Sequence, residues 1–221
     1  MLENVKPSAQ KKSYGQYCAL ARSLDIVGDR WNLLIIRELL PGPLRYGELR
    51  QSLPGIATNL LAQRLKALEH DGVVERRLAV DGVAYALTAW GAELRRPMEA
   101  LAQWGARLLA SGRGDDDFGP RWLASALPAL LCEAVADPAQ TLGVEVDGLL
   151  LELRLGPDGP IVLIDPQQAP TTVVRAREEA IIALAAGQLS VDEAAAAGFI
   201  EGDVGVVRKV FERTSPLVTT G

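Results

Sequence analysis

Apolar residues between positions 44 and 87 are spaced first as in helices and then as in strands. Leu49 and Leu53 lie on one side of a first helix, which Pro54-Gly55 ends because this pair favours a turn. Leu61, Leu65 and Leu68 follow at helical spacing, and Thr58 is expected to cap this second helix. Residues 73–87 then alternate around Asp81-Gly82, a strong hairpin signal. Two helices followed by a hairpin predict a winged helix, a layout that binds DNA.

The outward side of the second helix carries Asn59, Ala62, Gln63 and Lys66. Amides, one small residue and one cation suit base edges and phosphates in a major groove. An ordinary solvated helix face would look the same, so the helix alone does not decide between the two interpretations. The hairpin favours DNA binding. Its acidic tip argues against insertion into the minor groove and leaves phosphate contact to arginines of the first strand.

The first half of the chain resembles the HxlR-type bacterial transcriptional regulators. The resemblance rests on residues 18–31, 33–39, 47–49, 55–61 and several shorter pieces that follow in order up to Val74. It implies a dimeric winged-helix repressor or activator without enzymatic activity. Combined with the helix pair, it gives nine residues expected at the DNA: Arg45, Tyr46, Thr58, Asn59, Gln63, Arg64, Lys66, Arg76 and Arg77. For Arg64, an ion pair with Glu48 or Glu69 is the alternative.

Two helices precede this region. The first is predicted near Gly15–Val27 and includes Cys18; the second begins at Asp29 or Asn32. Some HxlR-type regulators are thought to sense oxidants through a cysteine at this place, which makes Cys18 a redox candidate. The favoured interpretation is a small buried apolar side chain, the usual fate of a free cysteine.

Residues 89–111 are predicted to form one long helix. Its apolar residues follow a spacing close to a heptad and predict a homodimer interface, which the resemblance also implies. The alternative is packing within its own domain. The predicted interface residues are Leu94, Met98, Leu101, Trp104 and Leu108.

Small residues and three consecutive aspartates predict a linker at 113–118. A solvated linker is favoured there over a metal site, because oxygen ligands usually come from more than one segment. The linker divides the chain into a DNA-binding and dimerisation domain at 1–112 and a second domain at 119–221.

The second domain is predicted to be α+β, an antiparallel sheet with helices on one face. A helix over 118–135, interrupted near Pro128 and packing Cys132 inside, precedes four strands and further helices. Residues 187–194 and 198–203 resemble the sterol-carrier-protein fold, which implies a cavity for a lipid-like molecule. The same apolar residues could fill a closed core instead. The candidate pocket residues are Trp122, Leu151, Leu153, Phe199, Val207 and Phe211.

The net charge of −5 is unevenly distributed. Residues 1–112 hold 15 basic and 11 acidic residues (+4), and residues 113–221 hold 8 and 17 (−9), so only the first half attracts phosphates. A lone histidine, His70, and two distant cysteines support neither catalysis, a metal site nor a cofactor. No apolar run reaches the roughly 18–20 residues of a membrane span, and the N-terminus is no secretory signal, so a cytoplasmic protein is expected.

Overall fold

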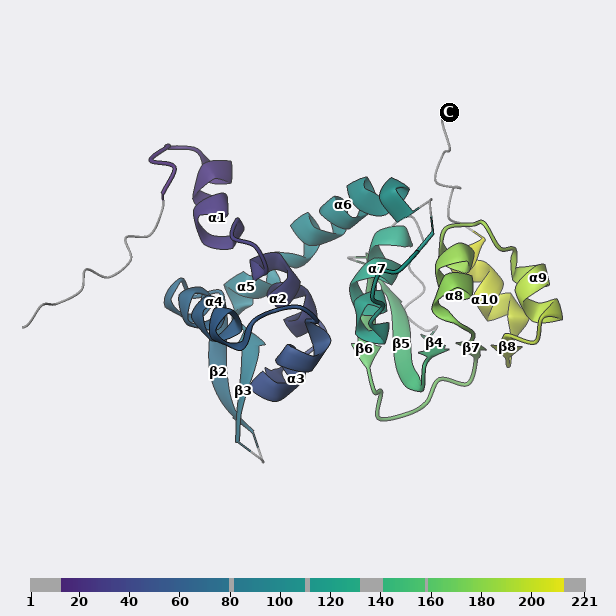
Figure 1. The fold of residues 1–221 in the computed structure, drawn as a ribbon. Coiled ribbons are helices and arrows are strands. Elements are labelled where there is room, and N and C mark those ends of the chain that lie inside the picture. The colour runs from purple at the N-terminus through teal and green to yellow at the C-terminus, as the bar shows by residue number, and fades with distance from the viewer. Residues whose placement is uncertain (1–12, 80–81, 110–111, 132–140, 158, 213–221) are drawn as a thin grey trace, which may run out of the picture.

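The computed structural model describes residues 13–79, 82–109, 112–131, 141–157 and 159–212. These residues form two α+β halves joined through the helix α6, which extends from one half toward the other (Figure 1). The wing-tip residue Asp81, the predicted N-terminal arm up to residue 12, and Cys132 lie outside the described residues. The predicted α+β class is confirmed in both halves.

The first half is a winged helix. A three-stranded antiparallel sheet of order β1-β3-β2 lies beside four helices. Its short edge strand β1 was not predicted, but the two hairpin strands were. The elements are α1 (Ala19–Val27), α2 (Asn32–Leu39), β1 (Leu44–Arg45), α3 (Tyr46–Ser52), α4 (Thr58–His70), β2 (Val74–Ala79) and β3 (Gly82–Leu87).

The predicted leucine stripe of α4 anchors this half. Leu61, Leu65 and Leu68 are at most 1% exposed and share one core with α2, α3 and the sheet. Burying a leucine side chain is worth about 1.5–3 kcal/mol, so the stripe fixes which side of α4 faces outward. The turn before α4 needs Gly55, whose φ of 83° an L-residue side chain rarely tolerates.

The long helix expected over 89–111 is interrupted. Instead, α5 (Ala89–Ala92) and α6 (Arg95–Gly105) are followed by the 3-10 turn η1 (Ala106–Leu109). Pro97 lies in the first turn of α6. A proline there has no N–H to bond the carbonyl four residues earlier, so a continuous helix cannot pass through Glu93 without losing that bond.

The second half contains a five-stranded sheet of order β6-β5-β4-β7-β8, with helices on one side of it (Figure 1). The prediction of an antiparallel sheet is wrong in one place, since β4 and β7 pair in parallel. The fifth strand, β8, was also missed. The elements are η2 (Pro120–Trp122), α7 (Leu123–Leu130), β4 (Thr141–Val146), β5 (Leu149–Gly156), β6 (Gly159–Ile164), β7 (Val173–Arg175), α8 (Glu178–Ala185), α9 (Val191–Ala196), β8 (Ile200–Glu201) and α10 (Val204–Phe211).

The apolar face of this sheet packs against the helices in a single core. Leu151, Leu153, Val207 and Phe211 lie in this core with at most 2% exposure. Phe199 lies half-buried at its margin, and Trp122 lies where the two halves meet. Of these six residues, Trp122 alone lines one of the two pockets described, a pocket between the two halves, so the six do not form one common pocket.

Several predicted helix ends are confirmed and two are corrected. Ser190 and Glu193 form the expected capping box of α9, and Asp203 accepts the Gly205 N–H at the start of α10. Thr58, however, is already the first residue of α4, and Ala57 precedes it without a side-chain cap. Pro128 does not interrupt α7, which ends two residues after it. Among the described residues, no helix has the length and apolar character needed to span a bilayer.

Candidate nucleic-acid interface

The outer side of α4 is a continuous exposed strip. Asn59, Ala62, Gln63 and Lys66 are all exposed, whereas the leucines of the same helix are buried behind them. The Asn59 side-chain oxygen accepts a hydrogen bond from the Leu60 N–H. The strip thus offers amide donors and acceptors and one ammonium group along about two helical turns, the arrangement predicted from the sequence.

Tyr46 fixes the start of α4 rather than standing free at the surface. Its hydroxyl donates a hydrogen bond of 2.7 Å to the Thr58 carbonyl, which ties the first turn of α3 to the first turn of α4. The tyrosine is half-buried and packs on the core. It therefore holds the two helices in a fixed relation, a role that the sequence did not reveal.

Arg64 is partly buried and held by an ion pair. Its guanidinium forms an ion pair with Asp29 in the loop before α2, and the side chain is 19% exposed. Neither of the expected partners, Glu48 or Glu69, is involved; Glu48 instead accepts the Arg45 N–H at 2.6 Å. The ion pair uses Arg64 to hold α4 against that loop, so its predicted DNA contact has no support in the geometry.

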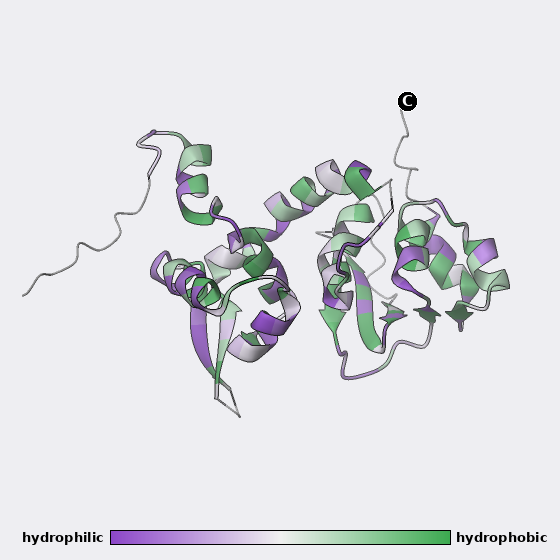
Figure 2. Cartoon of the chain, in the orientation of Figure 1, coloured by the Kyte–Doolittle hydropathy of each residue, from purple (hydrophilic) through white to green (hydrophobic). Residues whose placement is uncertain are grey.

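The two strand arginines of the wing are exposed but paired. Arg76 makes two hydrogen bonds to Glu69 at the end of α4, of 2.8 and 3.0 Å, and Arg77 bonds Glu75 at 2.7 Å. The Arg76 hydrogen bond lowers the pKa of Glu69, and the same contact raises the pKa of Arg76. β2 is coloured as hydrophilic in Figure 2 because Glu75, Arg76 and Arg77 occupy its middle.

A strained residue supports the turn between α3 and α4. Trp31 has a φ of 82°, which is rare for a bulky side chain. Its ring lies next to the turn, 3.8 Å from the position that a Cβ on Gly55 would occupy. The Arg30 guanidinium lies 5.5 Å from the centre of the same ring. The strained backbone thus places the indole ring beneath the turn that orients α4.

Two apolar helix faces are exposed among the residues that the structure describes. On α6 and η1, Leu101, Trp104 and Leu108 are 51%, 64% and 69% exposed, whereas Leu94 and Met98 pack partly on the core. On and just before α1, Tyr17 and Leu20 are also exposed. The alternative to the predicted dimer interface, packing of this face within its own domain, therefore does not hold for its outer three residues.

Cys18 lies at the start of α1 and is exposed. The favoured interpretation, a small buried apolar side chain, is therefore wrong. Arg22, four residues later, donates its backbone N–H to the Cys18 carbonyl and pairs its guanidinium with Asp25 at 3.8 Å. Within the described part of the chain, no second cysteine lies near it and no group of three or more metal-ligating side chains exists.

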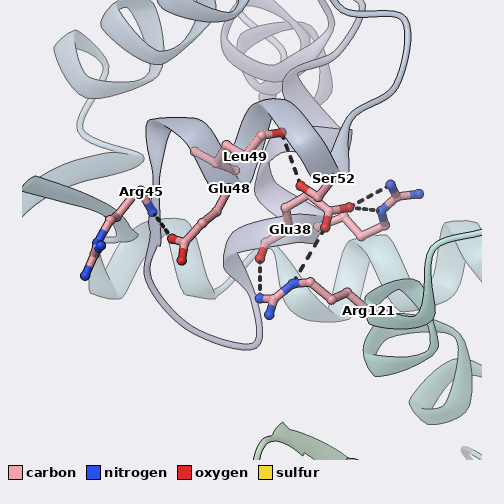
Figure 3. Close-up of polar contacts among 7 residues, drawn as sticks. Glu38, Arg45, Glu48, Leu49, Ser52 and Arg121 are labelled. Atoms are coloured by element: carbon pink, nitrogen blue, oxygen red, sulfur yellow. Dashed lines mark hydrogen bonds and ion pairs between the residues drawn. The ribbon is translucent and has the colours of Figure 1, made fainter. Parts of the chain in front are cut away.

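The second half contacts the winged helix through a buried carboxylate. Glu38, at the end of α2, is 1% exposed. Its carboxylate forms ion pairs with Arg37, at an N···O distance of 2.7 Å, and with Arg121 of η2, at 4.0 Å (Figure 3). Arg121 also reaches the Glu38 carbonyl at 3.4 Å, and the Arg37 guanidinium lies 4.3 Å from the centre of the Trp122 ring. Gln103 of α6 donates to the Ala129 carbonyl of α7 at 3.0 Å. The two halves are thus linked by specific polar contacts.

Comparison with known proteins agrees with this geometry. The sequence profile of the HxlR-like helix-turn-helix family matches residues 26–112. The chain is 34% identical over 94 residues to the HTH-type transcriptional regulator sll1512 of Synechocystis, a match that covers 41% of this chain and 70% of the relative. It is 36% identical over 85 residues to the HTH-type transcriptional regulator YodB of Bacillus subtilis, over 37% of this chain and 76% of YodB.

These matches show the class: a helix-turn-helix protein related to transcriptional regulators and not to enzymes. Through its N-terminal half, the chain belongs to the HxlR-like helix-turn-helix family. The solved structure of the reduced form of YodB from B. subtilis shares 34% identity with it and covers 44% of this chain and 99% of YodB, with a TM-score of 0.38. The family assignment rests on the sequence matches.

Proposed function

We propose that the protein is a homodimeric transcriptional regulator that inserts α4 into the major groove of double-stranded DNA. The observation that carries the proposal is the exposed strip of Asn59, Gln63 and Lys66, held outward by three buried leucines. Amide side chains in such a strip can bond adenine edges in two places, and a lysine can contact a phosphate or guanine. The positive charge of residues 1–112 attracts the duplex to this half.

The remaining predicted residues take supporting roles. Arg45 and Thr58 lie exposed at the starts of α3 and α4, close to where a phosphate would pass. Arg76 and Arg77 contact phosphates from the wing, and each must share or give up its glutamate partner to do so. Tyr46 and Arg64 orient α4 from behind without reaching the DNA.

A second copy of the chain covers the exposed face of α6 and η1. Leu101, Trp104 and Leu108 would otherwise leave a large apolar patch in water, and such patches usually mark an interface. A symmetric dimer also lets a helix-turn-helix protein bind two half-sites about 34–36 Å apart, or a multiple of that distance. Leu94 and Met98, being partly buried already, contribute less to this interface. Residues 1–112 then act as the DNA-binding and dimerisation domain, 113–118 as the linker and 119–221 as the second domain.

The test begins with DNA selected from a random pool by the purified full-length protein. Gel-shift affinities should fall as salt rises, because binding releases counterions from the phosphates. Gln63→Ala should lose about 1–3 kcal/mol of discrimination between the selected and random DNA, whereas Lys66→Ala should weaken both about equally. Glu179→Gln, an exposed change in the second half, is the control. Wild-type binding by both α4 variants would contradict the proposed DNA face.

One observation favours a second mode of regulation. Cys18 is exposed next to the apolar side of α1, where an oxidant or a second copy can reach its sulfur atom. Oxidation of an accessible thiol adds oxygen or a disulfide bond and so changes the surface of α1. A Cys18→Ser protein should then keep its DNA affinity after peroxide treatment that releases wild type. Release of the variant by the same treatment would rule out this thiol switch.

The likeness of the second half to sterol-carrier proteins adds a third proposal, that it binds an apolar molecule between sheet and helices. The apolar sheet face and helices provide such an environment, although Leu151, Leu153, Val207 and Phe211 now close it. Entry would require α10 to move, since two of these residues belong to that helix. Native mass spectrometry of gently purified protein should show a co-purified lipid-like mass. An unliganded protein that also gains no thermal stability from added fatty acid would contradict the proposal.

A further inference from the structure

One pocket lies between the two halves, outside both the DNA face and the C-terminal core. It has a volume of about 470 Å³, within the usual range of small-molecule sites. One wall comes from α3 and the turn after it, with Glu48, Ser52 and Pro54. The other comes from the end of the linker and η2, with Asp117, Phe118 and Trp122. A molecule in this pocket would contact both halves at once.

The charged residues in the pocket walls favour a positively charged ligand. Glu48 and Asp117 bring two carboxylates to the pocket, and neither makes an ion pair among the contacts described. Among the described residues that line the pocket, the one cation is Arg121, and it already faces Glu38 (Figure 3). The pocket therefore has an excess of negative charge that a bound cation would neutralise.

Two aromatic rings form part of the apolar lining of the pocket. Phe118 and Trp122 meet edge to face, with ring centres 6.2 Å apart. The Trp122 ring already has the Arg37 guanidinium 4.3 Å from its centre, so this residue makes a cation–π contact within the protein. Rings combined with carboxylates are the usual means of binding ammonium groups that carry an apolar body.

From these observations we propose that the junction pocket binds a small organic cation with an aromatic or apolar body, and that its occupancy changes the affinity of α4 for DNA. The effect on DNA affinity rests on the proposed function. The physical link is short: the pocket wall includes Ser52 and Pro54, which end α3 and begin the turn to α4. A ligand that holds the linker against α3 also restrains that turn.

Benzyltrimethylammonium is a suitable probe, and phenylacetate is its anionic counterpart with the same ring. Each is titrated into ¹⁵N-labelled full-length protein at constant ionic strength without DNA. The cation should shift the indole N–H signal of Trp122, assigned with Trp122→Phe, and leave the exposed Trp90 and Trp104 signals in place. Equal shifts from both probes, or a cation response confined to Trp90 and Trp104, would overturn the proposal.

Variants of the walls test the charge and the ring separately. Asp117→Asn and Glu48→Gln should each weaken benzyltrimethylammonium about 2- to 5-fold, and glutamine at position 48 can keep its bond to the Arg45 N–H. Phe118→Leu should cost a similar factor. Glu179→Gln, on the exposed side of α8, is the matched charge control and should bind like wild type. Unchanged binding by all three pocket variants would contradict the site.

A separate measurement tests whether the pocket ligand changes the affinity for DNA. A gel shift with the selected DNA should show operator affinity changed about 5-fold or more by saturating benzyltrimethylammonium, and the concentration that gives half of this change should rise about 2- to 5-fold in Asp117→Asn. Cation binding with no change in operator affinity would overturn the proposed link between the pocket and DNA binding. Failure to bind DNA at all would refute the proposed function and still leave the pocket titration interpretable.

Discussion

The contact between Glu38 and Arg121 should couple the stabilities of the two halves. Glu38 is 1% exposed, and the Arg121 Nε lies 4.0 Å from its Oε2. We would compare Glu38→Gln, Arg121→Met and the double variant with wild type. Because these substitutions keep the side-chain length, they remove the charges and leave the packing nearly unchanged.

The expected magnitude follows from the geometry. Two unit charges 4.0 Å apart interact by about 4 kcal/mol at an effective dielectric constant of 20. Two facts reduce this value: Arg121 is still 25% exposed, and Arg37 shares the same carboxylate at 2.7 Å. We therefore expect a coupling energy of about 1–2 kcal/mol. Glu38→Gln alone should cost about 3 kcal/mol, since it leaves two arginines without their partner.

The assay is urea unfolding followed by tryptophan fluorescence, with the coupling energy taken from the four free energies of unfolding. The exposed pair Asp192–Arg208 provides the matched control, because its side chains are 77% and 41% exposed and its coupling should stay below about 0.5 kcal/mol. If the Glu38–Arg121 cycle gave no more than this control, the contact would not link the halves and the reasoning would be refuted.

Three further predictions concern the DNA-binding half. Leu65→Ala should lower the free energy of unfolding by about 2–5 kcal/mol in urea, because Leu65 is 1% exposed, whereas Ala62→Ser on the outer side should change it by less than about 0.5 kcal/mol. Tyr46→Phe should cost about 1 kcal/mol and weaken DNA binding through a looser α4; equal affinity in a gel shift would disprove the link. The hydrogen bond from Arg76 lowers the pKa of Glu69 from its usual 4.5, so this pair stabilises the folded state fully above pH 4.5 and loses that effect as the pH falls through the lowered pKa. An NMR titration of the Glu69 carboxyl should give a midpoint below 4.5, and Arg76→Gln should raise that midpoint.

Periodicity predicted the first half well because local rules decide it. Leucines at helical spacing, a Pro-Gly turn and a hairpin signal each act within a few residues. The partner of Arg64 could not be found this way, since Asp29 is 35 residues distant and lies in a loop. The bond from Tyr46 to the Thr58 carbonyl could not be predicted for the same reason, because it depends on how α3 and α4 pack.

Features that depend on residues distant in the chain were predicted less well from the sequence. The heptad-like spacing over 89–111 suggested one helix, although Pro97 was a local signal against it. The exposure of Cys18 could not be predicted, because it depends on whether a neighbouring element covers α1. In the second half, alternation found the strands but says nothing about their order, so the parallel pairing of β4 and β7 stayed hidden.

That parallel pairing also has a consequence for how the chain reaches its native state. β4 pairs with β5 and β5 pairs with β6, each through a short hairpin, but the other neighbour of β4, which is β7, follows both hairpins in the chain, and Val173 then packs over Gly143. Contacts between distant segments form slowly, because the chain loses the entropy of the intervening loop before the contacts stabilise the fold. The winged helix also has a distant pairing, Leu44 with Tyr85, but all of its strands precede β4 in the chain. During synthesis the winged helix can therefore be complete before β4 has paired with β7.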